Sequence, residues 1–111
     1  MIVVINNNST EKDIQEFEKA FSKLSSPEHV KEALLDYQFP IPDPDSNPLN
    51  FPLVISTDDD IIFCILNVSA GYGGEGPHGT CKILRQCGFK FNQNLIYKDS
   101  RGQRVRTLFK K

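Results

Sequence analysis

Residues 53–68 read LVISTDDDIIFCILNV, two apolar runs separated by a short acidic segment. The runs Leu53–Ser56 and Ile61–Val68 are rich in β-branched residues, and residues 57–60 have the composition of a turn. This stretch predicts a β-hairpin. Because Ile61–Val68 is apolar at nearly every position, we expect it to be the central strand of a sheet.

Upstream of the hairpin, the pattern predicts a strand and then a helix. Met1–Ile5 is a short β-branched run, and residues 11–25 are amphipathic with helical spacing. Thr10 and Asp13 have the spacing of a capping box, with Asp in place of the usual Glu or Gln. The apolar face of this helix contains Ile14, Phe17, Phe21 and Leu24.

A second helix is expected between Ser26 and Pro40. Ser26 suits an N-cap, Pro27 suits the first helical position, and a helix must end before Pro40. Its apolar face would contain Val30, Ala33, Leu34 and Tyr37. Residues 39–52 contain five of the seven prolines and predict an extended, polyproline-like loop.

Downstream of the hairpin, five of the seven glycines lie within residues 71–79. A short helix follows with Ile83, Leu84 and Cys87 inward, and Gly88 ends it. Residues 89–91 and 94–98 are expected to be extended, and 103–109 to be a strand. The order is β-α-α-β-β-α-β-β. It indicates one α+β domain over residues 1–111, with a mostly antiparallel sheet and helices on one side.

The charges divide the chain into two halves. Residues 1–60 contain 4 Lys and 12 Asp or Glu, whereas residues 61–111 contain 9 Lys or Arg and 2 Asp or Glu. The acidic half disfavours binding to long nucleic acids. The two opposite poles suit pairing between copies of the chain, and we expect a homo-oligomer.

Composition also indicates the compartment. No apolar run approaches the roughly 20 residues of a membrane helix, and the N-terminus lacks the basic region of a signal peptide. The three cysteines are an odd number, which suits reduced thiols rather than a disulfide framework. We therefore expect a cytoplasmic protein with no membrane partner.

The glycine-rich segment contains the most suggestive motif. Gly71–Gly76 matches G-x-G-x-x-G between a predicted strand and a predicted helix. Its position in the last third of a small chain leaves no room for a dinucleotide-binding unit. Two interpretations remain open: a tight turn that only connects strand to helix, or an anion site of main-chain N–H groups at a helix N-terminus. The candidate ligand-binding residues here are Tyr72, Gly73, Gly74, Gly76, His78, Gly79 and Thr80.

Two arginines complete this candidate site. Arg104 and Arg106 share one face of the last predicted strand, and guanidinium groups bind phosphate well. The alternative is a solvated strand face that balances the acidic half. In the ligand-binding interpretation Gly73, Gly74, Gly76 and Gly79 expose donors, and the arginines neutralise phosphate. Tyr72 would stack on the ligand, His78 would donate or accept a hydrogen bond, and Thr80 would donate its hydroxyl.

The catalytic and metal alternatives are weaker. His78 and Cys81 could form a nucleophilic pair with a lowered thiol pKa, but no third residue orients them. Asp58–Asp60 are consecutive carboxylates that cannot all converge on one cation. We therefore expect no catalytic residue, no metal site and no cofactor, and a protein that is not an enzyme.

Gly71-Tyr72-Gly73-Gly74-Glu75-Gly76-Pro77, followed by an apolar helix, resembles a G-Y-G-G-x-G-P signature of small phage and mobile-element proteins. The resemblance implies a phage setting, hence the host cytosol. It also points to anti-defence nucleotide sponges of the anti-Thoeris and anti-CBASS type. The function expected is therefore capture of a small phosphorylated or cyclic nucleotide ligand. The alternative is an immunity or antitoxin-type protein that docks a basic toxin or nuclease through Asp43, Asp45 and Asp58–Asp60.

Overall fold

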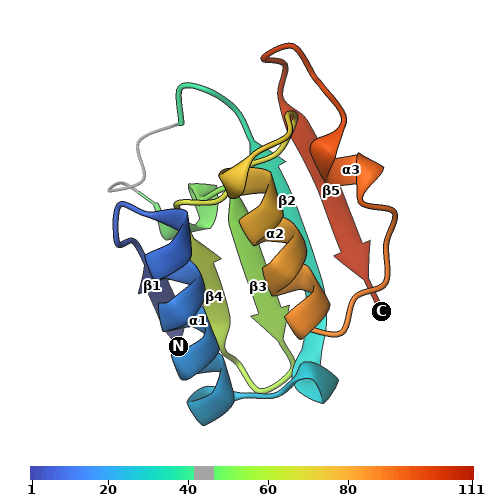
Figure 1. The fold of residues 1–111 in the computed structure, drawn as a ribbon. Helices are drawn as coiled ribbons and strands as arrows, with labels where there is room; N and C mark the ends of the chain where they lie inside the picture. The colour runs from blue at the N-terminus through green and yellow to red at the C-terminus, as the bar shows by residue number, and fades with distance from the viewer. Residues whose placement is uncertain (42–46) are drawn as a thin grey trace.

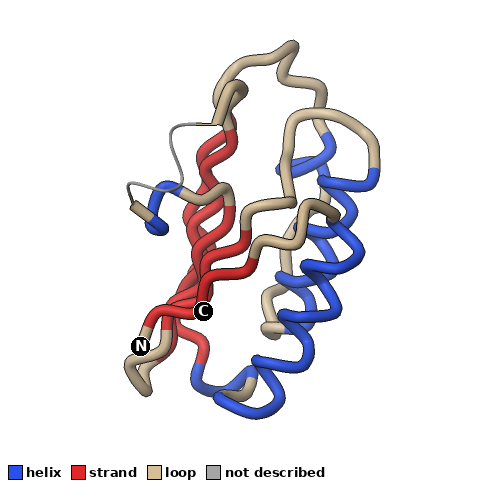
Figure 2. Tube along the Cα trace, turned by 90° about the vertical axis from the view of Figure 1, so that its left-hand side faces the viewer, coloured by secondary structure: helices blue, strands red, loops and turns tan. Residues whose placement is uncertain are grey.

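A five-stranded sheet, covered on one face by helices, forms the molecule (Figures 1 and 2). The computed structural model describes residues 1–41 and 47–111. The strands lie in the order β1-β4-β3-β2-β5, and only the β1–β4 pair is parallel. The elements are β1 (Ile2–Ile5), α1 (Thr10–Leu24), β2 (Val30–Tyr37), β3 (Leu53–Thr57), β4 (Ile62–Ile65), α2 (Glu75–Gln86), α3 (Asn94–Tyr97) and β5 (Val105–Lys110).

The α+β class, the mostly antiparallel sheet and the helices on one side are confirmed. The expected hairpin is β3–β4, with Leu53 opposite Ile65 and Ser56 opposite Ile62. The expectation that residues 61–68 form the central strand was wrong, because β3 occupies the middle of the sheet. A third antiparallel strand, β2, continues the sheet beyond β3, and this moves the centre by one strand.

The second expected helix was wrong. The start signal acts only locally: Ser26 and Pro27 begin a single 3-10 turn, η1 (Pro27–His29), and the chain then becomes strand β2. In β2 the buried Ala33 and Leu35 alternate with more exposed neighbours, which is the two-residue period of a strand. Pairing of β2 with both β3 and β5 outweighs the high helix propensity of the Lys, Glu, Ala and Leu residues in this segment.

The segment before β5 also differs from expectation. Residues 94–97 form one helical turn, α3, and the side chain of Asn92 accepts a hydrogen bond from the main-chain N–H of Asn94. Extended runs at residues 89–91 and 94–98 would need a strand partner, but β5 already occupies the free edge of β2. The element order therefore agrees in outline, but residues 30–37 are a strand instead of a helix, and residues 94–97 are a helical turn instead of a strand.

The proline-rich loop is described only in part. Residues 42–46 lie outside the described residues, and Pro48–Asn50 form a 3-10 turn, η2, on the sheet face opposite the helices (Figure 2). Phe51 is buried there against Val54 and Cys64. This small cluster covers only part of that face.

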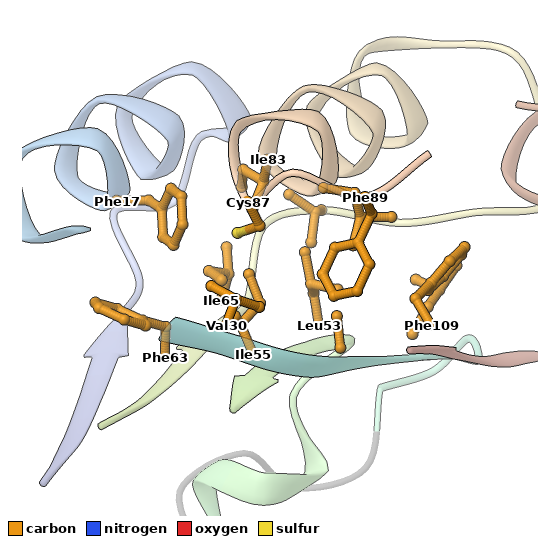
Figure 3. Close-up of a cluster of buried hydrophobic side chains, with 14 of the residues drawn as sticks. Phe17, Val30, Leu53, Ile55, Phe63, Ile65, Ile83, Cys87, Phe89 and Phe109 are labelled. Atoms are coloured by element: carbon orange, nitrogen blue, oxygen red, sulfur yellow. The ribbon is translucent and has the colours of Figure 1, made fainter. Parts of the chain in front are cut away.

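The main core lies between the sheet and the helices (Figure 3). Phe17 and Phe21 of α1 stack on each other at 5.1 Å and both contact the ring of Phe63 edge-on. Ile83 and Leu84 of α2 are fully buried, as expected, and Gly88 ends the helix with a φ of 90°. Within the described residues, no helix is long and apolar enough to cross a membrane.

Candidate functional site

Two loops meet where the parallel strands β1 and β4 end. The β1–α1 loop and the β4–α2 loop are joined by the carboxylate of Asp13, which is fully buried. Its Oδ1 accepts hydrogen bonds from the main-chain and side-chain nitrogens of Asn7, at 2.7 and 3.0 Å. Its Oδ2 accepts two more from the corresponding groups of Asn67, at 2.9 and 3.0 Å. One carboxylate therefore fixes the relative position of both loops.

The expected capping box was wrong, because Ser9 is the N-cap of α1. Its hydroxyl accepts a hydrogen bond from the main-chain N–H of Lys12 at 3.2 Å. Thr10 is already helical, and its hydroxyl donates to the main-chain oxygen of Asn67 at 2.6 Å. Thr10 and Asp13 thus hold the neighbouring loop rather than the helix end.

A cleft of about 530 Å³ opens beside these loops, and we call it the loop cleft. It lies near the first turns of both α1 and α2, and it is also lined by Tyr37 at the end of β2 and by Ile41 in the following loop. Burial and the proximity of Tyr72 raise the pKa of the Tyr37 hydroxyl. The residues lining the loop cleft are Asn8, Ser9, Thr10, Tyr37, Ile41, Leu66, Asn67, Val68, Ser69, Tyr72, Glu75 and Gly76.

The glycine-rich segment contributes to the loop cleft through Tyr72 and Gly76. The Tyr72 hydroxyl lies 2.7 Å from the hydroxyl of Ser69, and the Tyr72 side chain is 44% exposed. Gly76 packs against these two hydroxyl groups, since a Cβ there would be 2.0 Å from Ser69 Oγ and 2.9 Å from the Tyr72 hydroxyl. Gly73 and Gly74 are exposed just before α2. Gly74 is the N-cap of α2, and no side chain there accepts a hydrogen bond from the main-chain N–H groups of the first helical turn.

Of the seven candidates in this segment, only Tyr72 and Gly76 line the loop cleft, and the three that follow Gly76 lie elsewhere. Thr80 is fully buried, and its hydroxyl donates to the main-chain oxygen of Ser69 at 2.8 Å. Gly79 faces α1, where a Cβ would be 2.5 Å from Cγ2 of Thr10. His78 lies in a separate cleft between α1 and α2, and its Nδ1 is 3.4 Å from the Tyr97 hydroxyl. Thr80 and Gly79 therefore organise the site without reaching into it.

The two arginines are on the other face of the sheet. On β5, Phe109 points toward the helices, so Arg104 and Arg106 project from the opposite face by alternation. Arg104 binds the Asp36 carboxylate through two nitrogens, at 2.7 and 2.6 Å, and Arg106 lies 3.5 Å from it. The Arg104 guanidinium holds the pKa of Asp36 below its usual value. The structure does not bring these arginines to the glycine-rich segment.

The remaining chemical candidates are occupied or buried. Cys81 is fully buried, and burial raises the pKa of its thiol, contrary to the lowered pKa expected at a helix N-terminus. In the acidic turn, Asp58 accepts from His29 at 2.9 Å, and Asp59 lies 3.4 Å from the Ser25 hydroxyl. Within residues 1–41 and 47–111, no group of three or more potential metal ligands converges. Asp43 and Asp45 lie outside the described residues.

Of the twelve residues that line the loop cleft, only Tyr72 and Gly76 were among the expected ligand-binding residues. The residues that the sequence reasoning missed include Tyr37, Asn67 and Ser69, and also Asp13, which holds the two loops together. One feature of the sequence could have indicated a structural role for Asp13: it is an acidic residue in the first turn of an amphipathic helix, directly before the core residue Ile14. Tyr37 was assigned to the wrong kind of element, and the other two follow a strand whose neighbours were unknown. Comparisons with family models, with curated proteins and with solved structures find no match for this chain.

Proposed function

We propose that this protein binds a small nucleotide-like ligand in the loop cleft and does not react with it. The supporting observation is the position of the loop cleft, outside the carboxyl ends of parallel strands β1 and β4 and beside the first turns of two helices. Open α/β sheets bind ligands outside the carboxyl ends of their parallel strands, and the loop cleft has the same place relative to β1 and β4. A volume of about 530 Å³ is within the range of small-molecule sites.

The lining of the loop cleft favours a ligand with a ring, hydroxyl groups and little charge. Tyr72 and Tyr37 offer aromatic surfaces for a base, and the side-chain oxygen of Asn67 and the hydroxyl of Ser69 offer hydrogen bonds. The start of α2 provides main-chain N–H groups and the positive end of a helix dipole. Glu75 also lines the cleft, and among the residues that the structure describes no Lys or Arg lines it. A cyclic nucleotide, with one charge per phosphodiester, suits this lining better than a polyphosphate.

Sequestration without catalysis is the second part of the proposal. The only nucleophile–base pair that the sequence suggested contains Cys81, whose thiol is buried and has a raised pKa. A protonated, enclosed thiol is a poor nucleophile. A phage protein that captures a host signalling nucleotide, as the anti-defence sponges do, is the biological role we propose.

Titration calorimetry tests binding directly. The panel contains cyclic mononucleotides, cyclic dinucleotides and ADP-ribose, with ATP as the polyphosphate comparison. We expect binding of a cyclic nucleotide that weakens about tenfold or more in Tyr72→Ala, because stacking on an aromatic ring contributes about 1–3 kcal/mol. Gly76→Ala should also weaken it, since the added Cβ would approach Ser69 Oγ and come within 2.9 Å of the Tyr72 hydroxyl.

Arg106→Ala is the matched control, because Arg106 is 61% exposed on the opposite face of the sheet. It should leave the affinity unchanged. Absence of heat with every member of the panel, or equal losses in Arg106→Ala and Tyr72→Ala, would refute the proposal. Unchanged nucleotide after prolonged incubation, measured by chromatography, is expected, and turnover would contradict the non-catalytic part.

A further inference from the structure

The two edges of the sheet differ in how they are protected. At one edge, β5 carries Arg106 and Lys110 on its open face, and charged side chains are a common defence of an edge strand. At the other edge, β1 has the sequence Ile-Val-Val-Ile with no charge and no proline. Ile2 and Val4 are 50% and 46% exposed on the open face. The described residues leave this apolar edge without a strand partner.

We infer that β1 is the contact strand of a symmetric homodimer, in which β1 pairs antiparallel with β1 of a second copy. The main-chain oxygens of Met1 and Ile5 accept hydrogen bonds from the β4 side. By alternation, the N–H and C=O groups of Ile2 and Val4 point away from β4 and are free to pair. Placing the two-fold axis at Val3 sets Ile2 opposite Val4 of the second copy, so both pairs exchange their main-chain hydrogen bonds.

Helix α1 has a surface that fits this arrangement. Glu16 approaches Asn7, next to the end of β1, whereas Glu18 approaches Lys82 of α2, so Glu16 lies on the β1 side of α1. Ala20 and Lys23 follow Glu16 at helical spacing on that side. Val3 is opposite Phe63, which contacts Phe17 and Phe21, so Ala20 lies level with Val3.

The same two-fold axis therefore brings Ala20 close to Ala20 of the second chain. It also places Glu16 of each chain opposite Lys23 of the other, which gives two ion pairs. The spacing also agrees. Helix α1 packs on both β1 and β4, so the two α1 helices would lie about two strand spacings apart, roughly 10 Å. Packed helices are separated by about 8–10 Å, and a small residue at the crossing permits the closer end of that range. A second copy thus extends both layers at once, the sheet and the helices.

The competing arrangement joins the β1 edge of one copy to the β5 edge of the next. That contact is head to tail and would continue into open chains unless the rotation closed a ring. It would also leave the Glu16 and Lys23 stripe without its counterpart. The symmetric arrangement uses the uncharged edge on both sides and stops at two chains.

Sedimentation velocity of the untagged chain tests the inference. We expect a concentration-dependent species of twice the chain mass. Val4→Lys should raise its dissociation constant by about tenfold or more. Leu108→Lys is the matched control, because Leu108 is 49% exposed on the same face but lies on β5. It should have no effect on the symmetric dimer, and equal effects of the two lysines would overturn the inference.

A charge exchange on the helix surface provides a second test that does not alter the strand. Lys23→Glu should raise the dissociation constant about tenfold, because it replaces two attractive pairs by two repulsive ones. Glu16→Lys combined with Lys23→Glu should restore dimerisation. A monomer at all concentrations in the wild type, or failure of the double variant to restore the dimer, would overturn the inference. The loop cleft plays no part in these measurements, so their outcome is independent of the proposed function.

Discussion

Replacement of Asp13 by Asn tests the main physical claim about the two loops. Asn is nearly the same shape but keeps only one acceptor oxygen. It must therefore give up either the Asn7 pair of donors or the Asn67 pair, each held at 2.7–3.0 Å. A side-chain amide can rotate to accept from the new amide group, whereas a main-chain N–H cannot. Hydrogen bonds to a charged group contribute about 1.5–3 kcal/mol each, so we expect a loss of about 2–3 kcal/mol of unfolding free energy.

Urea unfolding followed by circular dichroism measures this difference. A loss of that size is a large share of the roughly 5–15 kcal/mol typical of a domain, and it corresponds to a fall of about 10 °C in the melting temperature. Glu18→Gln is the control, since Glu18 is an exposed carboxylate on the same helix, 3.9 Å from Lys82. We expect it to change stability by less than about 0.5 kcal/mol. A loss below about 1 kcal/mol for Asp13→Asn, or no difference from the control, would refute the reasoning.

Three further outcomes follow from local geometry. Gly79→Val should destabilise by about 2–3 kcal/mol through overpacking against α1, whereas Gly73→Val, with nothing within 4 Å of its Cβ, should be nearly neutral in thermal melts; similar losses would contradict the packing argument. The hydrogen bond that His29 donates to Asp58 raises the pKa of His29 above 6.5. This contribution to stability is present at low pH and is lost as pH rises through the folded pKa. An NMR titration should show the raised pKa in the wild type and a lower value in Asp58→Asn. Burial raises the pKa of the Cys64 thiol to about 11 and that of the Cys87 thiol to about 12. Iodoacetamide should therefore label neither cysteine at pH 8 until denaturant is added, and rapid labelling of the native protein would contradict their burial.

The candidate site is an example of interactions that connect distant segments. Asp13 and Asn67 are 54 residues apart in the chain, and Arg104 and Asp36 are 68 apart. Neither pairing has a local signature. The arginine pairing changes the interpretation most, because it moves two expected phosphate contacts to the opposite face of the sheet and leaves the loop cleft with little positive charge.

Local pattern alone determined the α+β class, the 53–68 hairpin, the first helix, and the helix that ends at Gly88. These elements depend on hydrophobic period, turn composition and helix stop signals, all of which act over a few residues. Only the tertiary structure decided the state of residues 30–37. Their apolar positions fit a helix as well as a strand, and pairing with β3 and β5 selects the strand. The tertiary structure likewise decided which residues meet. Alternation along a strand assigns a side chain to one of the two faces of the sheet, but only the packed helices determine which face is covered.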